Sequence, residues 1–190
     1  MSADPYVYPG SRVLINQEDI RDSEMLEAFE RTITANRMEH LPARIPMNYP
    51  GYRRLHRNLF EPIYSWAGKE RTVNIAKGGH LFCLVPYIAA QMEQRFAAVR
   101  SDDALNSPSP ADFAARAAEH ICEINAIHPF RDGNGRTLRA FLECLARAAG
   151  HTVALRRIDP DAWNAASISS FKDGCYNAMR QVVTDLIVAG

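Results

Sequence analysis

Two long stretches of helical periodicity, joined by a short loop rich in Gly, constrain the fold of this chain most strongly. Ser109 and Pro110 form a helix-start signal, and apolar residues then recur at helical spacing to about Ala126. A second helix is predicted over residues 135–149, with Gly150 as its stop. Two such helices favour an all-α fold.

Similar patterns predict further helices, and one segment reads differently. Residues 71–85 alternate in polarity around Gly78-Gly79, which predicts a β-hairpin, the only β element of any size. Pro46 and Pro50 indicate a loop. Asp22 and Ser23 are N-cap candidates for a helix that ends before Leu41. Further predicted helices run from Tyr52 to Tyr64, from Pro86 to about Ser101, from Pro160 to Ser170, and from Tyr176 to Val188.

Composition sets broader limits. The chain has 190 residues, 47% of them hydrophobic, which fits a single domain with a real core. Lys+Arg and Asp+Glu are equal at 22 each, which argues against a main role in binding nucleic acid or an anionic membrane directly. Four cysteines without a C-x-x-C pair, together with no signal peptide and no membrane-spanning stretch, favour a reduced cytoplasm.

The loop between the two long helices combines several groups that bind anions. Gly133 and Gly135 flank Asn134 where the second helix begins, so backbone N–H groups are expected to form an anion nest there. Arg136 and Arg139 are three residues apart and share a helix face. Two guanidinium groups beside a nest predict binding of a polyphosphate.

Two further residues suggest what is done to that polyphosphate. Asp132 is a typical Mg²⁺ ligand, because Mg²⁺ takes few protein ligands and shares phosphate oxygens. His128 has an imidazole that can accept a proton from an attacking hydroxyl group. A lone His or a Gly-Asn-Gly turn is usually structural, so the prediction rests on the presence of all these groups within twelve residues.

His56 and His80 lack the spacing of a zinc site, and Lys69-Glu70-Arg71 reads as a charged loop.

The stretch from His128 to Arg139 resembles the Fic motif, H-P-F-x-[D/E]-G-N-G-R-x-x-R, and matches all nine of its specified positions. Tyr64 to Gly68 and the Lys77-Gly78-Gly79 turn look like the segments that precede the motif in that family. The resemblance covers about residues 12–188, so we expect one domain over 1–190, with an irregular segment at 1–11.

The resemblance implies a helical bundle with a β-hairpin flap over the active site of a protein adenylyltransferase. His128 would be the base that deprotonates a target hydroxyl, and Asp132 would hold Mg²⁺ on ATP. Gly133, Asn134 and Gly135 would line the anion hole, with Asn134 on the α-phosphate. Arg136 would bind the β- and γ-phosphates, and Arg139 the γ-phosphate.

The same resemblance implies a docking site for the target protein. An extended target segment would pair with the edge of the flap by strand addition. The flap residues are Val73, Asn74, Ile75, Ala76, Lys77, Gly78, Gly79, His80, Leu81 and Phe82. Known targets of related bacterial toxins include DNA gyrase and topoisomerase IV.

Many Fic proteins are inhibited by a Glu within the pattern [S/T]-x-x-x-E-[G/N]. Ser23 to Glu27 lacks the last position of this pattern, and Ser169 to Asp173 has Asp in place of Glu. We therefore expect a separate small antitoxin to supply the inhibitory Glu against Arg139. Three alternatives remain: transfer of another nucleotide, transfer of phosphate as in Doc-type kinases, which carry Lys in place of Gly135, and an inactive interaction module.

Overall fold

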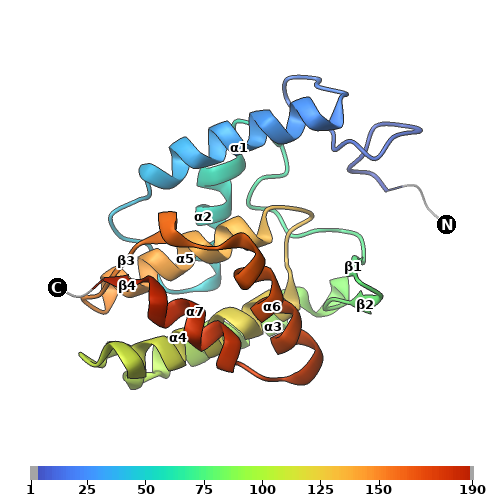
Figure 1. The fold of residues 1–190 in the computed structure, drawn as a ribbon. Coiled ribbons are helices and arrows are strands. Elements are labelled where there is room, and N and C mark those ends of the chain that lie inside the picture. The colour runs from blue at the N-terminus through green and yellow to red at the C-terminus, as the bar shows by residue number, and fades with distance from the viewer. Residues whose placement is uncertain (1–3, 189–190) are drawn as a thin grey trace.

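The computed structural model describes residues 4–188, and the predicted all-α class with a small β-hairpin is confirmed (Figure 1). The helices are α1 Ser23–Glu39, α2 Tyr49–Phe60, α3 Ile88–Ser101, α4 Pro110–Ile127, α5 Asn134–Ala148, α6 Pro160–Asp173 and α7 Asn177–Leu186. The strands are β1 Ala76–Lys77, β2 His80–Leu81, β3 Thr152–Val153 and β4 Ile187–Val188.

The long helices α4 and α5 form the centre of the bundle. Helix α5 packs against α2 and α4, while α7 and α6 cover another side of α4. Helix α1 lies across α2 at the top of Figure 1, and the β1–β2 hairpin projects at the right. None of the helices within residues 4–188 is long and apolar enough to cross a bilayer.

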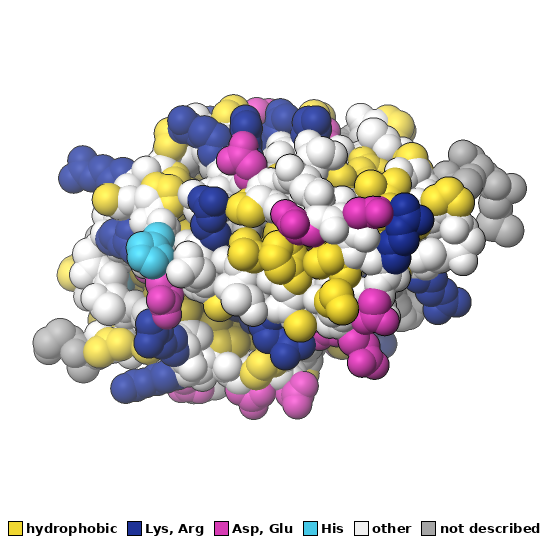
Figure 2. All heavy atoms as spheres, turned by 90° about the horizontal axis from the view of Figure 1, so that it is seen from above, with side chains coloured by type: hydrophobic (Ala, Val, Ile, Leu, Met, Phe, Trp, Pro, Cys, Tyr) yellow, Lys and Arg dark blue, Asp and Glu magenta, His cyan; other side chains and the backbone are white. Residues whose placement is uncertain are grey.

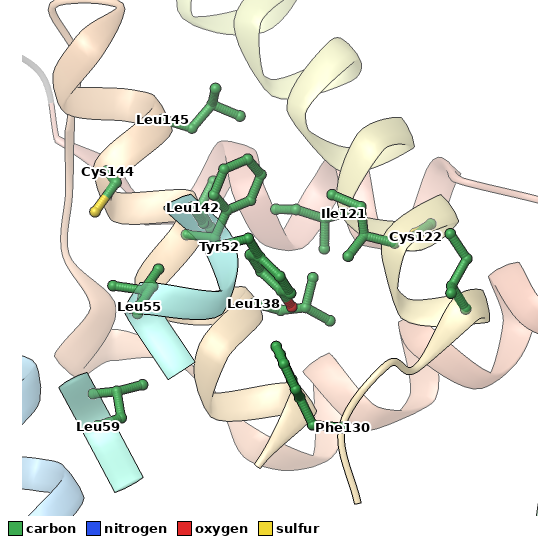
Figure 3. Packing of buried hydrophobic residues seen from close by; sticks show 14 of the residues in the cluster. Tyr52, Leu55, Leu59, Ile121, Cys122, Phe130, Leu138, Leu142, Cys144 and Leu145 are labelled. Atoms are coloured by element: carbon green, nitrogen blue, oxygen red, sulfur yellow. The ribbon is translucent and has the colours of Figure 1, made fainter. Parts of the chain in front are cut away.

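An aromatic cluster anchors the loop between α4 and α5 in the core (Figure 3). Phe130 of the loop stacks on Tyr52 of α2 with ring centroids 5.6 Å apart, and Phe141 of α5 meets Tyr52 edge-on at 5.6 Å. All three rings are fully buried, and each contributes about 1.5–3 kcal/mol of burial energy. The burial of Phe130 therefore fixes the α4–α5 loop against the core.

Most helix ends follow the predicted caps. Asp22 and Ser109 accept hydrogen bonds from backbone N–H groups in the first turns of α1 and α4. The expected start of α2 was wrong, because Asn48 caps this helix and Pro50 sits within its first turn, where a missing N–H costs nothing. Helix α5 has Gly133 at its N-cap and no side-chain cap, so its first N–H groups remain available to a ligand.

The β structure differs from the prediction in two ways. Each strand of the hairpin has only two residues, joined by Gly78 and Gly79, both with positive φ as a tight hairpin turn requires. A second pair was missed: the last helix ends at Leu186, and Ile187–Val188 pairs with Thr152–Val153. Thr152 and its partner Val188 lie far apart in the sequence, and periodicity within one segment does not reveal such a long-range pairing.

The N-terminal segment from residue 4 is irregular, as predicted, but it is held in place. Tyr6 packs edge-on against Trp66, and its hydroxyl accepts a hydrogen bond from the backbone N–H of Thr72. Asp4 pairs with Arg131 of the α4–α5 loop at 2.7 Å. Residues 1–3 of the expected irregular segment lie outside the described residues.

Candidate active site

His128 lies at the end of α4, where the backbone turns out of the helix. Its φ of 54° lies in the left-handed region, so the backbone changes direction at this residue. The Nδ1 atom lies 3.0 Å from the carbonyl oxygen of Asn125. A carbonyl only accepts hydrogen bonds, so Nδ1 carries the proton and Nε2 keeps a lone pair. The imidazole is therefore prepared to act as a base through Nε2.

The surroundings of His128 keep its imidazole neutral. Phe82 of the flap stacks on the ring, with centroids 3.9 Å apart and an angle of 14° between the planes. Burial, with a smaller contribution from the positive charge of Arg71, lowers the pKa of His128 from 6.5 to about 4. At neutral pH the ring is uncharged and can accept a proton.

Arg71 lies in a loop, as predicted for Lys69-Glu70-Arg71, but its side chain is buried and not solvated as expected. Its side chain is 1% exposed and donates hydrogen bonds to the carbonyl oxygens of His128 and Val73, both at 2.8 Å, and to that of Cys83. Burial lowers the pKa of the guanidinium, and the carbonyl dipoles solvate its charge. Arg71 thereby connects both stems of the flap to the base. No pattern in the sequence marked it for this role.

His56 of α2, for which the sequence predicted no ligand role, supports the site from below the loop. Its Nε2 donates to the carbonyl oxygen of Asp132 at 3.0 Å, and its Nδ1 accepts from the N–H of Gly68 at 2.9 Å. Burial lowers the pKa of His56 to about 3, so the ring is neutral. The imidazole stacks on Phe130 with centroids 3.8 Å apart, which fixes the loop from a second side.

The two motif glycines serve different needs. Gly133 has φ of 78°, and a Cβ there would lie 2.4 Å from the ring of Phe60, so only glycine fits. A Cβ on Gly135 would meet nothing within 4 Å. Gly133 is required by packing, whereas Gly135 leaves open space at the start of α5.

Asn134, predicted to lie on the α-phosphate, uses its side chain within the loop. Its Nδ2 donates to the carbonyl oxygen of Phe130 at 2.8 Å, and its Oδ1 accepts from the Phe130 N–H at 3.0 Å. The amide side chain therefore closes the loop onto α5. A contact of Asn134 with phosphate then comes from its backbone N–H at the helix start.

The two motif arginines differ in their partners. Arg136 pairs with Glu30 of α1 at 2.7 Å and with Asp132 at 3.3 Å, and its guanidinium lies 4.6 Å from the Phe60 ring centroid. Arg139 makes no ion pair with any described residue, and its buried Nε has no hydrogen-bond partner. Burial lowers the pKa of Arg139, with a smaller contribution from Arg136. Arg139 is thus an uncompensated cation that an anionic ligand would satisfy.

Asp132 suits Mg²⁺ in the way that nucleotide sites require. Its carboxylate is 45% exposed, lines the cavity, and accepts a hydrogen bond from the N–H of Gly133. Residues 4–188 contain no group of three or more His, Cys, Asp or Glu arranged to hold a metal by themselves. One carboxylate is sufficient where phosphate oxygens and water complete the shell, so the residues present fit Mg²⁺.

The motif, the flap and α6 together enclose a cavity of about 920 Å³. All the predicted catalytic, nucleotide and metal residues line it, as do six of the ten flap residues: Ile75, Ala76, Lys77, Gly78, His80 and Phe82. Sequence reasoning missed the wall formed by α6. That wall comprises Pro160, Trp163, Asn164, Ser167, Ile168, Phe171 and Lys172.

The flap contacts α6 through a chain of aromatic rings. Phe171 lies 5.2 Å from Phe82 and 5.9 Å from His80 between ring centroids. The remaining flap residues Val73, Asn74, Gly79 and Leu81 do not line the cavity, and Leu81 is 54% exposed. The flap therefore presents one side to the cavity and another to solvent.

Neither acidic residue of the two segments with partial similarity to the inhibitory pattern makes an ion pair with the motif in the part of the chain that the structure describes. Glu27 is an exposed residue paired with Arg31. Asp173 is exposed at the end of α6, where Gly174 provides the C-cap. The acidic residue of α1 that does contact the motif is Glu30, and its partner is Arg136, the first motif arginine.

Comparisons with known proteins show the family to which the chain belongs. The model of the Fic/DOC family matches residues 46–146, and the chain belongs to this family. It is 38% identical over 169 residues to the probable protein adenylyltransferase y4lH of Sinorhizobium fredii, covering 88% of each chain. It is 35% identical over 167 residues to the probable protein adenylyltransferase Fic of Escherichia coli, covering 87% of this chain and 84% of the relative.

A solved structure shows the same fold. The BepC protein of Bartonella tribocorum, a VirB-translocated effector with bound AMPPNP, superimposes with a TM-score of 0.88. The two are 25% identical, and the alignment covers 97% of each chain.

Proposed function

We propose that this chain is a protein adenylyltransferase, which transfers AMP from Mg²⁺-ATP to a hydroxyl group of a target protein. The observation that carries the proposal is the pairing of a neutral base with an unfilled anion site. His128 has a free Nε2 lone pair, and Arg139 has a buried Nε without a partner in the same cavity. The names of the relatives and the AMPPNP bound to BepC support the choice of reaction and nucleotide.

The residues of the chain perform three tasks in this reaction. The target hydroxyl gives its proton to Nε2 of His128 as its oxygen forms a bond to the α-phosphorus of ATP. The bond between the α-phosphorus and the bridging oxygen to the β-phosphate breaks, and pyrophosphate leaves. The N–H groups at the start of α5, with Arg136 and Arg139, stabilise the negative charge on the phosphates. Mg²⁺ held by Asp132 would neutralise phosphate charge and orient the leaving group.

The flap is proposed to hold the target segment. Its short ladder leaves backbone groups available for pairing with an added strand. The exposed Leu81, Leu84 and Tyr87 lie on or just beyond the flap and offer apolar contacts for such a segment. A target hydroxyl presented there is close to His128, because Phe82 of the flap touches the imidazole.

Label transfer tests the proposed function. The purified chain with Mg²⁺ and a bacterial lysate is given ATP labelled at the α- or the γ-phosphate, beside a His128→Ala control. Label from the α-position alone, lost in the control, is the expected result. Label from the γ-position would make the chain a kinase, the main alternative. Transfer from another labelled nucleotide but not ATP would redirect the proposal to a different nucleotidyl group.

We also propose an inhibitory partner and a target class, both resting on the family resemblance. A small antitoxin would place a Glu against Arg139, whose guanidinium has no acidic partner among residues 4–188. DNA gyrase and topoisomerase IV are the first targets to assay with α-labelled ATP. If neither protein takes up label while another protein of the lysate does, this target class is excluded.

A further inference from the structure

Glu30 is an acidic residue on the buried face of α1, which it shares with Leu26 and Thr34. On the face seen in Figure 2, acidic and basic side chains are interspersed at the surface above α1. Glu30 instead is 8% exposed and reaches the active site, 106 positions before its partner Arg136. The mechanism proposed above uses Arg136 but gives Glu30 no role.

The contacts of Glu30 fix the guanidinium of Arg136 in one place. One carboxylate oxygen of Glu30 accepts from Arg136 at 2.7 Å, and the other accepts from the hydroxyl of Tyr64. The ring of Phe60 lies beneath the guanidinium at 4.6 Å. The contact between Arg136 and Asp132 is longer, at 3.3 Å, and uses the same nitrogen of Arg136.

This arrangement affects the metal site because Arg136 and Mg²⁺ would compete for the carboxylate of Asp132. A guanidinium paired with Asp132 opposes the approach of a divalent cation to the same carboxylate. Glu30 offers the guanidinium a closer acidic partner, so Arg136 can release Asp132 without losing its charge pairing. Without Glu30, the half-buried guanidinium of Arg136 would be left with Asp132 as its acidic partner.

Resting on the proposed function, we propose that Glu30 is a positioning residue that gives Arg136 a closer acidic partner than Asp132, so that the Asp132 carboxylate can leave Arg136 for the Mg²⁺–nucleotide complex. Glu30 touches neither nucleotide nor metal in this role and acts through Arg136. If Glu30 has this role, its loss should change the factor by which Mg²⁺ strengthens the binding of ATP. We call this factor the enhancement by Mg²⁺.

The experiment compares Glu30→Gln with Glu27→Gln, a matched control one turn earlier whose exposed carboxylate pairs only with Arg31. ATP binding is measured by calorimetry with and without Mg²⁺, in the absence of any target protein. Glu30→Gln is expected to reduce the enhancement by Mg²⁺ about tenfold, within the range of coupling between neighbouring charged groups. Glu27→Gln should retain the enhancement of the wild-type chain.

Two results would overturn the proposal. An unchanged enhancement by Mg²⁺ in Glu30→Gln would leave Glu30 a purely structural anchor of α1. Equally tighter binding of ATP with and without Mg²⁺ would make Glu30 an inhibitor that competes with phosphate for Arg136. In an Arg136→Ala background, Glu30→Gln should no longer alter the enhancement, and a persisting effect would show that Glu30 does not act through Arg136.

A second variant guards against loss of folding. Tyr64→Phe removes the hydroxyl that holds Glu30, and it should reduce the enhancement by Mg²⁺ in the same direction but by less. Because binding is measured without transfer, failure of the label-transfer assay and failure of this inference are separate outcomes. His128→Ala should lose transfer and keep the enhancement.

Discussion

Arg71 donates a hydrogen bond from Nε to the carbonyl oxygen of His128 at 2.8 Å, so the position of the base depends on a residue 57 positions earlier. The same guanidinium holds the carbonyl of Cys83 at the far stem of the flap. The catalytic turn and the flap are therefore one mechanical unit, although the sequence separates them.

Arg71→Ala is expected to destabilise the protein by about 2–4 kcal/mol, because it leaves several buried carbonyl groups without a donor. Chemical denaturation measures this change, and the exposed Lys69→Ala serves as control. Arg71→Lys keeps the charge but lacks the fork that reaches both stems, so transfer should slow more than ATP binding weakens. Equal losses of both would contradict the proposed link between flap and base.

The pH dependence of transfer should reflect the lowered pKa of His128. With a pKa of about 4, the imidazole stays neutral well below pH 6.5, so the acidic limb of kcat/KM is expected near pH 4.

The free energy of unfolding should also decrease at acidic pH, for the same reason. The folded chain binds protons at His56 and His128 less readily than the unfolded chain, so the free energy of unfolding falls as pH drops from about 6.5 toward 4. An acidic limb at pH 6.5 would disprove the burial argument.

Phe82→Ala should expose one face of the His128 imidazole to water. Its stacked ring supplies part of the burial that lowers the pKa of His128, so the pKa should rise toward 6.5 in the variant. Titration of the imidazole C–H signals by NMR measures the shift directly. Leu81→Ala, which changes the exposed residue just before Phe82, should leave the titration unchanged.

Gly133→Ala and Gly135→Ala should have opposite effects on stability. The first adds a Cβ 2.4 Å from the Phe60 ring at a positive φ, and we expect a loss of about 2–4 kcal/mol. The second adds a methyl group to open space within a helix, where Ala is favoured over Gly by about 0.5–1 kcal/mol. Thermal melting of the pair distinguishes them, and similar losses in both would contradict the packing model.

The sequence supported the parts of the structure that depend on local chemistry. Ser109 and Asp22 act as helix caps, Gly78-Gly79 forms the hairpin turn, and the motif lies between two helices as predicted. Each of these features is set by a few neighbouring residues. The residues that carry the proposed chemistry were found for the same reason, since they lie within one stretch of twelve.

The supporting residues escaped prediction because their roles depend on contacts across the fold. Arg71, His56 and Glu30 are ordinary residues in their own segments, and only the closed structure brings them to the loop. The wall formed by α6 was missed on the same grounds. The hairpin is shorter than predicted. The carbonyl oxygens of Val73 and Cys83 accept hydrogen bonds from Arg71 and so do not extend the ladder.

Each support of the motif loop comes from a part of the chain made earlier. Arg71, His56, Glu30 and Asp4 reach the loop across separations of 57, 76, 106 and 127 positions. Contacts of such long range close large loops, so they form later in folding than contacts within one helix. A chain emerging from the ribosome therefore gains the ability to modify its neighbours only at the end of folding, when the twelve residues that hold the chemistry have met the partners that orient them.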